Sequence, residues 1–431
     1  MSLHKVHPFG GQNRMLLKTI LNRVLPHKSF VYGTVRFCED ESGPALEVEI
    51  HARANGRPEC SGCGRRAPGY DRLPQRGFRF VPLWGMAVFF LYAPRRVNCR
   101  RCGVTVERLP WAVGKSQLTT TYAWFLAAWA KRLPWQQVAE AFRTNWNSVF
   151  RAVTLAVLWG VLHRSLEDVA AIGIDEIQWR KGHKYLTLVY QIEEGCKRLL
   201  WVGLERTEES LRGFFEMLGV ERATRLRFIC SDLWRPYLNV VAQKASQAIH
   251  VLDRFHIMAN LNKAVDQVRA EEARTLKADG YEQVLKHSRW CLLKRPENCT
   301  PQQTLKLQEI LKYNLRTVRA YLHREDFQQF WEYRSPTWAG HFLDGWCARV
   351  MRSRLKPLKK QVRTLRKHRD LILNWFRAKG TISAGVVEGL NYNAKLTMKK
   401  AYGFRTARGV KIALYHRLGA LPEPEVAHRF W

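Results

Sequence analysis

The stretch Ile172-Gly173-Ile174-Asp175, followed by Glu176, decides how the rest of the chain is interpreted. A short apolar run that ends in a carboxylate is typical of a buried strand that presents an acid at its end. A second run of this kind, Phe228-Ile229-Cys230-Ser231, leads to Asp232. Because successive side chains of a strand point to opposite faces, Glu176 is expected to face away from Asp175, in a structural or substrate-facing position. The two runs predict Asp175 and Asp232 at neighbouring strand ends.

A third acid, Glu388, lies in a segment with the pattern of a helix. At 3.6 residues per turn, Glu388 shares one helix face with Tyr392, Lys395 and Lys399. A carboxylate followed by basic side chains on one ridge suits a phosphodiester backbone that runs over the site. Gly389, beside the acid, is expected to allow close packing against the sheet. The alternative is an amphipathic surface helix whose charges are unconnected.

Three such acids in one chain suggest a metal-dependent nuclease or strand-transfer centre. Two metal ions can activate a water or a 3′-hydroxyl and stabilise the leaving oxygen, and oxygen-only ligands favour Mg²⁺ or Mn²⁺. Asp175 would bridge both ions, while Asp232 and Glu388 would each favour one. Asp253 is the rival ligand because it also follows an apolar strand, and it is otherwise expected to support the ligands together with His256.

The composition favours a nucleic acid as partner. The 431 residues include 71 Lys and Arg against 37 Asp and Glu, a net charge of +34, and such an excess displaces counterions from phosphates. Ribosomal or membrane-surface association is the alternative. We see no signal peptide, and no apolar stretch reaches the ~20 residues that span a bilayer. The chain is therefore expected to be cytoplasmic, with no membrane partner and with its cysteines reduced or metal-bound.

Two Cys-x-x-Cys pairs predict a structural zinc site. Cys60 and Cys63 form the first pair, Cys99 and Cys102 the second, and a glycine follows each pair. Tetrahedral Zn²⁺ needs four soft ligands, which two such turns supply. Unpaired reduced cysteines and disulfides are the alternatives. Four basic residues near the second pair are expected to contact phosphate or to form a solvated face: Arg95, Arg96, Arg100 and Arg101.

Residues 116–162 have an all-helical pattern, with helices expected over Tyr122–Arg132, Trp135–Phe142 and Asn147–Leu158. Helix, short turn, helix is the plan of a helix-turn-helix, whose second helix enters a DNA groove. Helical hairpins of this size are common, so DNA contact is a hypothesis. The groove-facing candidates are Asn145, Asn147, Ser148 and Arg151.

The segment from Ile172 onward predicts a mixed sheet followed by a long helical block. Three antiparallel strands are followed by helix, strand, helix and strand, which is the order of ribonuclease-H-like (RNase H-like) folds. Residues 255–380 are too long for a loop and are interpreted as a helical insertion. Its tryptophans either stack on bases or, more commonly, belong to the core: Trp290, Trp331, Trp338 and Trp346.

The sequence thus predicts a multidomain chain of mixed α+β and α/β class. It would combine a zinc-ribbon-like module, a helix-turn-helix and an RNase H-like catalytic core with a large all-helical insertion. The expected boundaries are 1–58 for an N-terminal helix and strands, 59–112 for the zinc module, 113–165 for the helix-turn-helix, 166–254 and 381–431 for the two parts of the core, and 255–380 for the insertion.

The order of these motifs resembles bacterial insertion-sequence transposases of the DDE type, most of all the ISL-three group. The resemblance runs from about Cys60 to Leu418. It implies an acidic triad of Asp175, Asp232 and Glu388, followed by Lys395 as a basic residue. It also implies an RNase H-like core interrupted before the last acid. Asp253 and His256 match a family motif to which we assign no role.

From this resemblance we expect an enzyme that binds the terminal inverted repeats of its element as a homodimer on double-stranded DNA. It would nick DNA by Mg²⁺-dependent hydrolysis and join the freed 3′-hydroxyl to target DNA. The alternatives are a non-catalytic zinc and helix-turn-helix regulator, which needs no acids at strand ends, and an RNase H-type nuclease without strand transfer.

Overall fold

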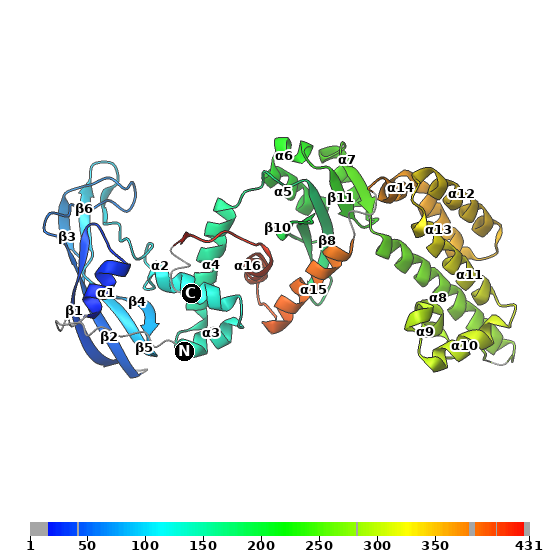
Figure 1. Ribbon diagram of the computed structural model, residues 1–431, viewed down its shortest axis with the longest axis horizontal. Coiled ribbons are helices and arrows are strands. Elements are labelled where there is room, and N and C mark those ends of the chain that lie inside the picture. Colours follow the sequence, from blue (N-terminus) through cyan, green and yellow to red (C-terminus); the bar gives the residue numbers. More distant parts are fainter. Residues whose placement is uncertain (1–15, 41–42, 282, 379–383, 402, 426–431) are drawn as a thin grey trace, which may run out of the picture. The chain divides into compact units, whose positions relative to one another are not determined.

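The computed structural model describes residues 16–40, 43–281, 283–378, 384–401 and 403–425. The chain is of mixed α and β class and divides into two compact units (Figure 1). The first comprises Met1–Arg164 with Leu421–Trp431, and the second comprises Ser165–Ala420.

The first unit contains a four-stranded sheet with the order β1-β2-β5-β4. Strands β2 and β5 are parallel, and the other two pairs are antiparallel. Trp111 fills the core beneath the sheet, with its ring 4.8 Å from that of Phe30 and 5.3 Å from that of Tyr92, both edge to face. The helix and strands expected before residue 58 are present. The elements are helix α1 (Leu17–Val24) and strands β1 (Phe30–Asp40), β2 (Gly43–Ala52), β4 (Arg76–Leu83) and β5 (Met86–Tyr92).

A smaller three-stranded sheet in the same unit carries the second cysteine pair. Its order is β3-β6-β7, with antiparallel neighbours. Its strands are β3 (Gly69–Arg72), β6 (Arg95–Cys99) and β7 (Gly103–Val106).

Three helices follow, at the positions that the sequence predicts: α2 (Thr120–Ala130), α3 (Trp135–Ala141) and α4 (Trp146–His163). Helix α2 begins where Thr119 accepts a hydrogen bond from the backbone of Tyr122, at 3.2 Å. The segment around Leu421 returns to these helices, because a Cβ built on Gly160 would lie 2.6 Å from Cβ of Leu421. Glu423 also pairs with Lys131 of the same unit.

The second unit is built on a five-stranded sheet with the order β10-β9-β8-β11-β12. Strands β8, β9 and β10 are antiparallel, whereas β11 runs parallel to both β8 and β12. The predicted succession of strands is confirmed. The strands are β8 (Ala171–Arg180), β9 (Lys184–Glu193), β10 (Cys196–Leu204), β11 (Phe228–Ser231) and β12 (Ile249–Leu252).

Helices cover both faces of this sheet, and the alternation of side chains along β8 assigns the two cores. Ile172 and Ile174 pack in the core that includes α5 (Glu208–Leu218), α6 (Val220–Thr224) and α7 (Arg235–Lys244). Ala171 and Ile177 pack on the other face in the core that includes α15 (Ala384–Lys400) and α16 (Ala407–Leu418). A strand that is apolar on both sides reads as an unbroken hydrophobic run, which explains the sequence before Asp175.

The chain between β12 and α15 is helical wherever it folds into regular structure within the described residues, as predicted. Trp331 and Trp346 lie in its core, whereas Trp290 and Trp338 are exposed. The side-chain amide of Asn374 ties the last of these helices to the sheet by donating to the carbonyl of His250 at 2.9 Å. The elements are α8 (Arg254–Ala278), α9 (Arg289–Leu293), α10 (Pro301–Leu311), α11 (Arg316–Gln328), α12 (Pro336–Arg352), α13 (Lys356–Lys367) and α14 (Arg369–Arg377), with short 3₁₀ turns at Pro296–Asn298 and Gln329–Glu332.

Among the residues that the structure describes, no helix combines the length and the apolar character needed to cross a membrane.

Candidate active site and cysteine cluster

The register of the parallel strands brings three aspartates to one level of the sheet. Cys230 lies opposite Gly173, and Ser231 lies opposite Leu252. Continuing the same register places Asp232 level with Asp175 on one side and with Asp253 on the other. The backbone N–H of Asp253 donates to the carbonyl of Ser231 at 2.9 Å, which fixes this alignment just beyond the ends of β11 and β12.

The prediction that Asp175 ends its strand is wrong. Strand β8 continues to Arg180, and Asp175 lies in its middle, opposite Leu188 of β9. The reason is that the antiparallel partner β9 continues past the point at which the parallel partner β11 stops. Asp175 is therefore held by backbone pairing on one side and open to Asp232 on the other.

Each of the three aspartates is held in the same way. One carboxylate oxygen accepts a hydrogen bond from a backbone N–H one or two residues further along the chain, and the other oxygen accepts one from a side chain. The backbone donors are Glu176 for Asp175 (2.8 Å), Trp234 for Asp232 (3.0 Å) and Phe255 for Asp253 (2.8 Å). The side-chain donors, in the same order, are Asn391 (2.6 Å), Arg206 (2.6 Å) and His256 (2.7 Å).

Asn391 is a site residue that the sequence analysis missed. It is buried on α15, and its amide oxygen accepts a hydrogen bond from the hydroxyl of Tyr190 at 2.9 Å. Helical spacing gives the signal, because Val387, Asn391 and Ala394 form the buried stripe of α15. A polar residue within an apolar stripe is buried only where it finds a hydrogen-bond partner, and here that partner is Asp175.

Glu388 lies on the exposed side of α15, next to the buried stripe, and the predicted stripe with Tyr392, Lys395 and Lys399 is exposed along its length. Within the described parts of the chain, Asp175, Asp232 and Glu388 do not bring three ligand oxygens within 4.8 Å of one another. The structure thus aligns the first two acids and places the third one helical turn from Asn391.

The close approach of α15 to the sheet is made at Gly173 and not at Gly389. A Cβ built on Gly173 would lie 2.4 Å from Cγ2 of Val387, whereas a Cβ on Gly389 would meet no atom within 4 Å. The expectation for Gly389 is therefore wrong: the residue lies on the exposed face. Val387, next to Glu388, is the side chain that packs into the space that Gly173 leaves open.

Arg206 and Glu176 form an ion pair beside the three aspartates. Arg206 follows β10 and contacts both Asp232 and Glu176, the latter with an Nη1–Oε1 distance of 3.1 Å. Glu176 faces away from Asp175, as expected from strand alternation. Burial, reinforced by the charge of Asp232, raises the pKa of Glu176 to about 7. Burial also raises the pKa of Asp175, against the opposing effect of the Glu176 N–H.

His256 carries a positive charge at neutral pH. Its hydrogen bond to Asp253 raises its pKa to about 9, against the opposing effect of burial. The centre therefore combines clustered carboxylates with cationic donors, whose charges offset part of the repulsion between the carboxylates.

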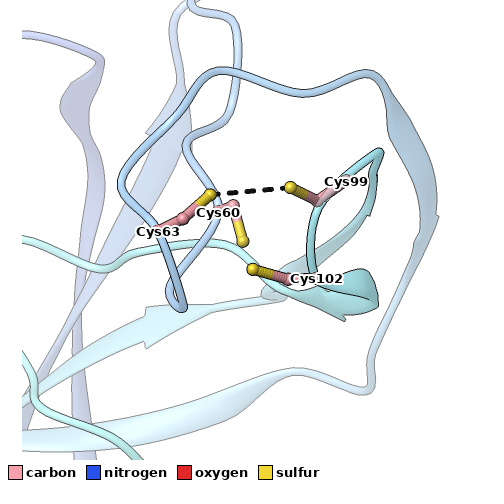
Figure 2. Close-up of side chains that lie close together, drawn as sticks. All are labelled: Cys60, Cys63, Cys99 and Cys102. Carbon is pink, nitrogen blue, oxygen red and sulfur yellow. Dashed lines mark hydrogen bonds between the residues drawn. The ribbon is translucent and has the colours of Figure 1, made fainter.

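The four cysteines of the two pairs converge in the first unit (Figure 2). All four Sγ atoms lie within 4.8 Å of one another, with Cys63 and Cys99 3.6 Å apart. No disulfide joins these four cysteines. Gly64 and Gly103 adopt φ angles of +70° and +73°, so the residue after each pair makes the left-handed turn that glycine favours. Backbone N–H groups of Arg101 and Cys102 lower the pKa of Cys99 to about 7.

Comparison with known proteins places these features in a family. A model described as a transposase family, of the DDE type and the ISL-three group, matches residues 172–413. That match covers more than half of the chain and includes all three predicted acids. The chain belongs to this family. Transposases cut and rejoin DNA.

Two bacterial transposases extend the similarity to most of the chain. The transposase for insertion sequence element IS1001 of Bordetella parapertussis is 28% identical over 378 residues, which cover 87% of this chain and 92% of the relative. The transposase for insertion sequence element IS1557 of Mycobacterium tuberculosis is 29% identical over 419 residues, which cover 89% of this chain and 91% of the relative.

The four arginines that surround the second cysteine pair of this transposase differ in environment. Arg95 is largely buried and binds Glu107 through two guanidinium nitrogens, at 3.0 and 2.7 Å, so its side chain has a structural role. Arg96 forms an ion pair with Asp71. Arg100 and Arg101 are exposed.

The predicted DNA-facing residues of the transposase lie at the start of α4. Asn145 caps the helix, because its side chain accepts a hydrogen bond from the N–H of Ser148 at 2.8 Å. Asn147 and Arg151 are exposed on the first two turns. The positions of these residues are compatible with a contact to DNA, which stays a prediction.

Proposed function

We propose that this transposase cuts DNA at the ends of an insertion sequence and joins the freed 3′-hydroxyl to target DNA, with Asp175, Asp232 and Glu388 as its catalytic acids. The observation that carries the proposal is the alignment of Asp175 and Asp232 at one level of adjacent strands. Two partly buried carboxylates on adjacent strands repel each other, and divalent cations bound between them would offset that repulsion.

The catalytic core is proposed to be RNase H-like. The strand order β10-β9-β8-β11-β12, with three antiparallel strands followed by two parallel ones, supports this assignment. The helices on both faces and the helical segment between β12 and α15 also fit a core with an insertion before the last acid.

The donor set of the centre fits Mg²⁺ or Mn²⁺. Asp175, Asp232 and Glu388 offer carboxylate oxygens, which these hard cations prefer. When bound, the cations would activate the attacking oxygen and stabilise the leaving oxygen. Asp253 and His256 are proposed to support the ligands from the next strand, since His256 holds the carboxylate of Asp253 at 2.7 Å.

The cysteine cluster is proposed to hold a structural Zn²⁺. Four thiolates complete a tetrahedral coordination sphere and leave no position open for a substrate. The cluster joins Cys60 and Cys63 to Cys99 at the end of β6 and to Cys102 in the turn before β7, so the ion would fix the smaller sheet of the first unit.

Contact with DNA is proposed at several exposed basic and polar groups on both units. In the first unit these are Arg100, Arg101, Asn147 and Arg151, and in the second Lys395 and Lys399. The terminal inverted repeats and the target would both be double-stranded DNA. A homodimer is proposed because two element ends must be handled together.

A set of conservative variants tests the proposal. D175N, D232N and E388Q should each lose Mg²⁺-dependent cleavage of end-containing DNA by at least about a hundredfold, as expected when a ligand of the reacting centre is lost. Each variant should retain DNA binding. The matched control is E216Q, which removes one charge from the exposed face of α5.

Two outcomes would support the alternative functions. A chain that binds end DNA but does not cleave it in any divalent cation acts as a regulator. A chain that cleaves but forms no joined product from a pre-cut 3′-hydroxyl end acts as a nuclease without strand transfer. Cleavage that persists in E388Q would remove Glu388 from the triad.

A further inference from the structure

We propose that Arg206 is a resident counter-ion of the acidic centre and competes with the divalent cation for Asp232. The inference rests on the proposed metal centre and deepens it. It assigns a role to a residue that lies outside the predicted triad.

The contacts of Arg206 join two acids from different strands. Nη2 lies 2.6 Å from Oδ2 of Asp232, and Nη1 lies 3.1 Å from Oε1 of Glu176. The guanidinium carbon lies 4.5 Å from the ring centroid of Trp234. The side chains of Asp232 and Glu176 are only 12% and 15% exposed, so little solvent screens these charges.

The backbone on both sides of Arg206 is anchored. Before it, Glu205 has a φ of 62°, and its carbonyl accepts a hydrogen bond from the hydroxyl of Thr187 at 2.7 Å. After it, the Thr207 side chain caps α5 by accepting from the N–H of Ser210 at 3.2 Å. The guanidinium group is thus delivered to the acids from a fixed position, and any withdrawal must come from rotation of its side chain.

The donors at the other two aspartates differ from Arg206. Asn391 at Asp175 is a neutral amide, and His256 at Asp253 can release its proton. Arginine stays protonated in proteins. A cation that approaches Asp232 therefore meets a fixed positive charge on one of its two oxygens, whereas one that approaches Asp175 meets none.

The consequence is a centre whose negative charge is partly offset before metal binds. With Arg206 in place, Asp232 and Glu176 share one positive charge and the carboxylates keep their alignment. Both carboxylate oxygens of Asp232 become available to a divalent cation only when the guanidinium group withdraws from Oδ2. The affinity of the centre for metal should therefore rise when this competitor is removed.

Calorimetric titration of the zinc-loaded full chain with Ca²⁺, without DNA, tests the inference. Ca²⁺ prefers oxygen ligands and does not compete for the thiolates. R206Q should bind Ca²⁺ about tenfold more tightly than the wild type, because a unit charge a few ångströms from the ligand is gone. R206K, which retains the charge, should stay near the wild type. The control R225Q removes one charge where Arg225 pairs with exposed Glu167, and should bind as the wild type does.

A second measurement uses Trp234, over which the guanidinium group lies. The fluorescence of Trp234 is obtained by subtracting the fluorescence of W234F from that of the wild type. Withdrawal of Arg206 on Ca²⁺ binding should change this difference, and the change should be missing in R206Q. This readout does not depend on the stability of R206Q, because it is first made in the wild type. No Ca²⁺-induced change in the wild type would overturn the inference.

The results separate the inference from the proposed function. If D232N abolishes Ca²⁺ binding while R206Q leaves the affinity unchanged or weakens it, the role of Arg206 alone is overturned. Absence of Ca²⁺ binding in both wild type and R206Q would overturn the metal centre, and the role of Arg206 with it.

Discussion

The side-chain amide of Asn391 donates a 2.6 Å hydrogen bond to Oδ2 of Asp175 and thereby joins helix α15 to the centre of strand β8. The two residues are 216 positions apart in the chain. Glu388 lies one helical turn before Asn391, so this bond also sets the position of the helix that carries the third proposed acid.

Replacement of Asn391 should therefore affect both stability and catalysis. N391A leaves the buried hydroxyl of Tyr190 and one oxygen of Asp175 without their partner, which costs about 1–3 kcal/mol. Urea unfolding of the full chain measures this loss, and DNA cleavage should fall as well. The control N393A changes an exposed asparagine of the same helix and should alter the free energy of unfolding by less than about 0.5 kcal/mol. Equal effects of the two variants would contradict the role of the Asn391–Asp175 bond.

The close contact between Gly173 and Val387 yields a second prediction. A Cβ at residue 173 lies 2.4 Å from Cγ2 of Val387, so G173A should destabilise the second unit by about 1–3 kcal/mol through overpacking. The double variant G173A/V387A should recover part of this loss, because the shorter side chain frees the space. Thermal unfolding measures both.

Gly389 provides the matched control for that prediction. It lies on the same helix, and an added Cβ would meet no atom within 4 Å. G389A should therefore leave stability unchanged or raise it by up to about 1 kcal/mol, since alanine favours the helix. A loss of stability comparable to that of G173A would show that the helix packs on the sheet through its other face.

The cysteine cluster yields a third prediction, on metal content. The purified chain should contain one equivalent of zinc, and C60S should lose it because three thiolates remain of the four. Strong chelators should lower the unfolding temperature of the first unit and leave that of the second unchanged. Elemental analysis and calorimetry measure the two effects. C196S, which alters a cysteine outside the cluster, should keep its zinc; zinc loss there, or full zinc in C60S, would contradict the assignment.

Local features of the sequence predicted most of the elements and only part of the site. Apolar runs and helical periods are local signals. They place helices α2, α3 and α4 within a few residues and give the order of strands and helices in the second unit. The convergence of the cysteine pairs also follows from spacing, because two such turns can share one ion. These predictions need no knowledge of the register between strands.

The missed features depend on contacts between distant segments. The continuation of β8 past Asp175 results from pairing with β9. Asn391 lies 216 residues after Asp175 in the chain, and Arg206 lies 26 residues before Asp232. No local pattern around Arg206 distinguishes it from the many other arginines. The exposed position of Gly389 was missed because the sequence does not reveal which face of α15 meets the sheet.

His256 yields the last prediction, on the dependence of stability on pH. Its pKa is raised from 6.5 to about 9 in the folded chain, chiefly by the hydrogen bond to Asp253. A raised pKa means that the folded state holds the proton more tightly than the unfolded state does. The stabilisation is therefore complete below about pH 6.5 and is lost as the pH rises through about 9. H256Q should remove this dependence. The difference between wild type and H256Q in the free energy of unfolding should therefore be larger near pH 6.5 than above about pH 9. Urea unfolding of both proteins across the window measures the difference, in which the other titrating groups cancel. A difference that stays constant with pH, or that grows as the pH rises, would show that the charged imidazole does not stabilise the carboxylate of Asp253.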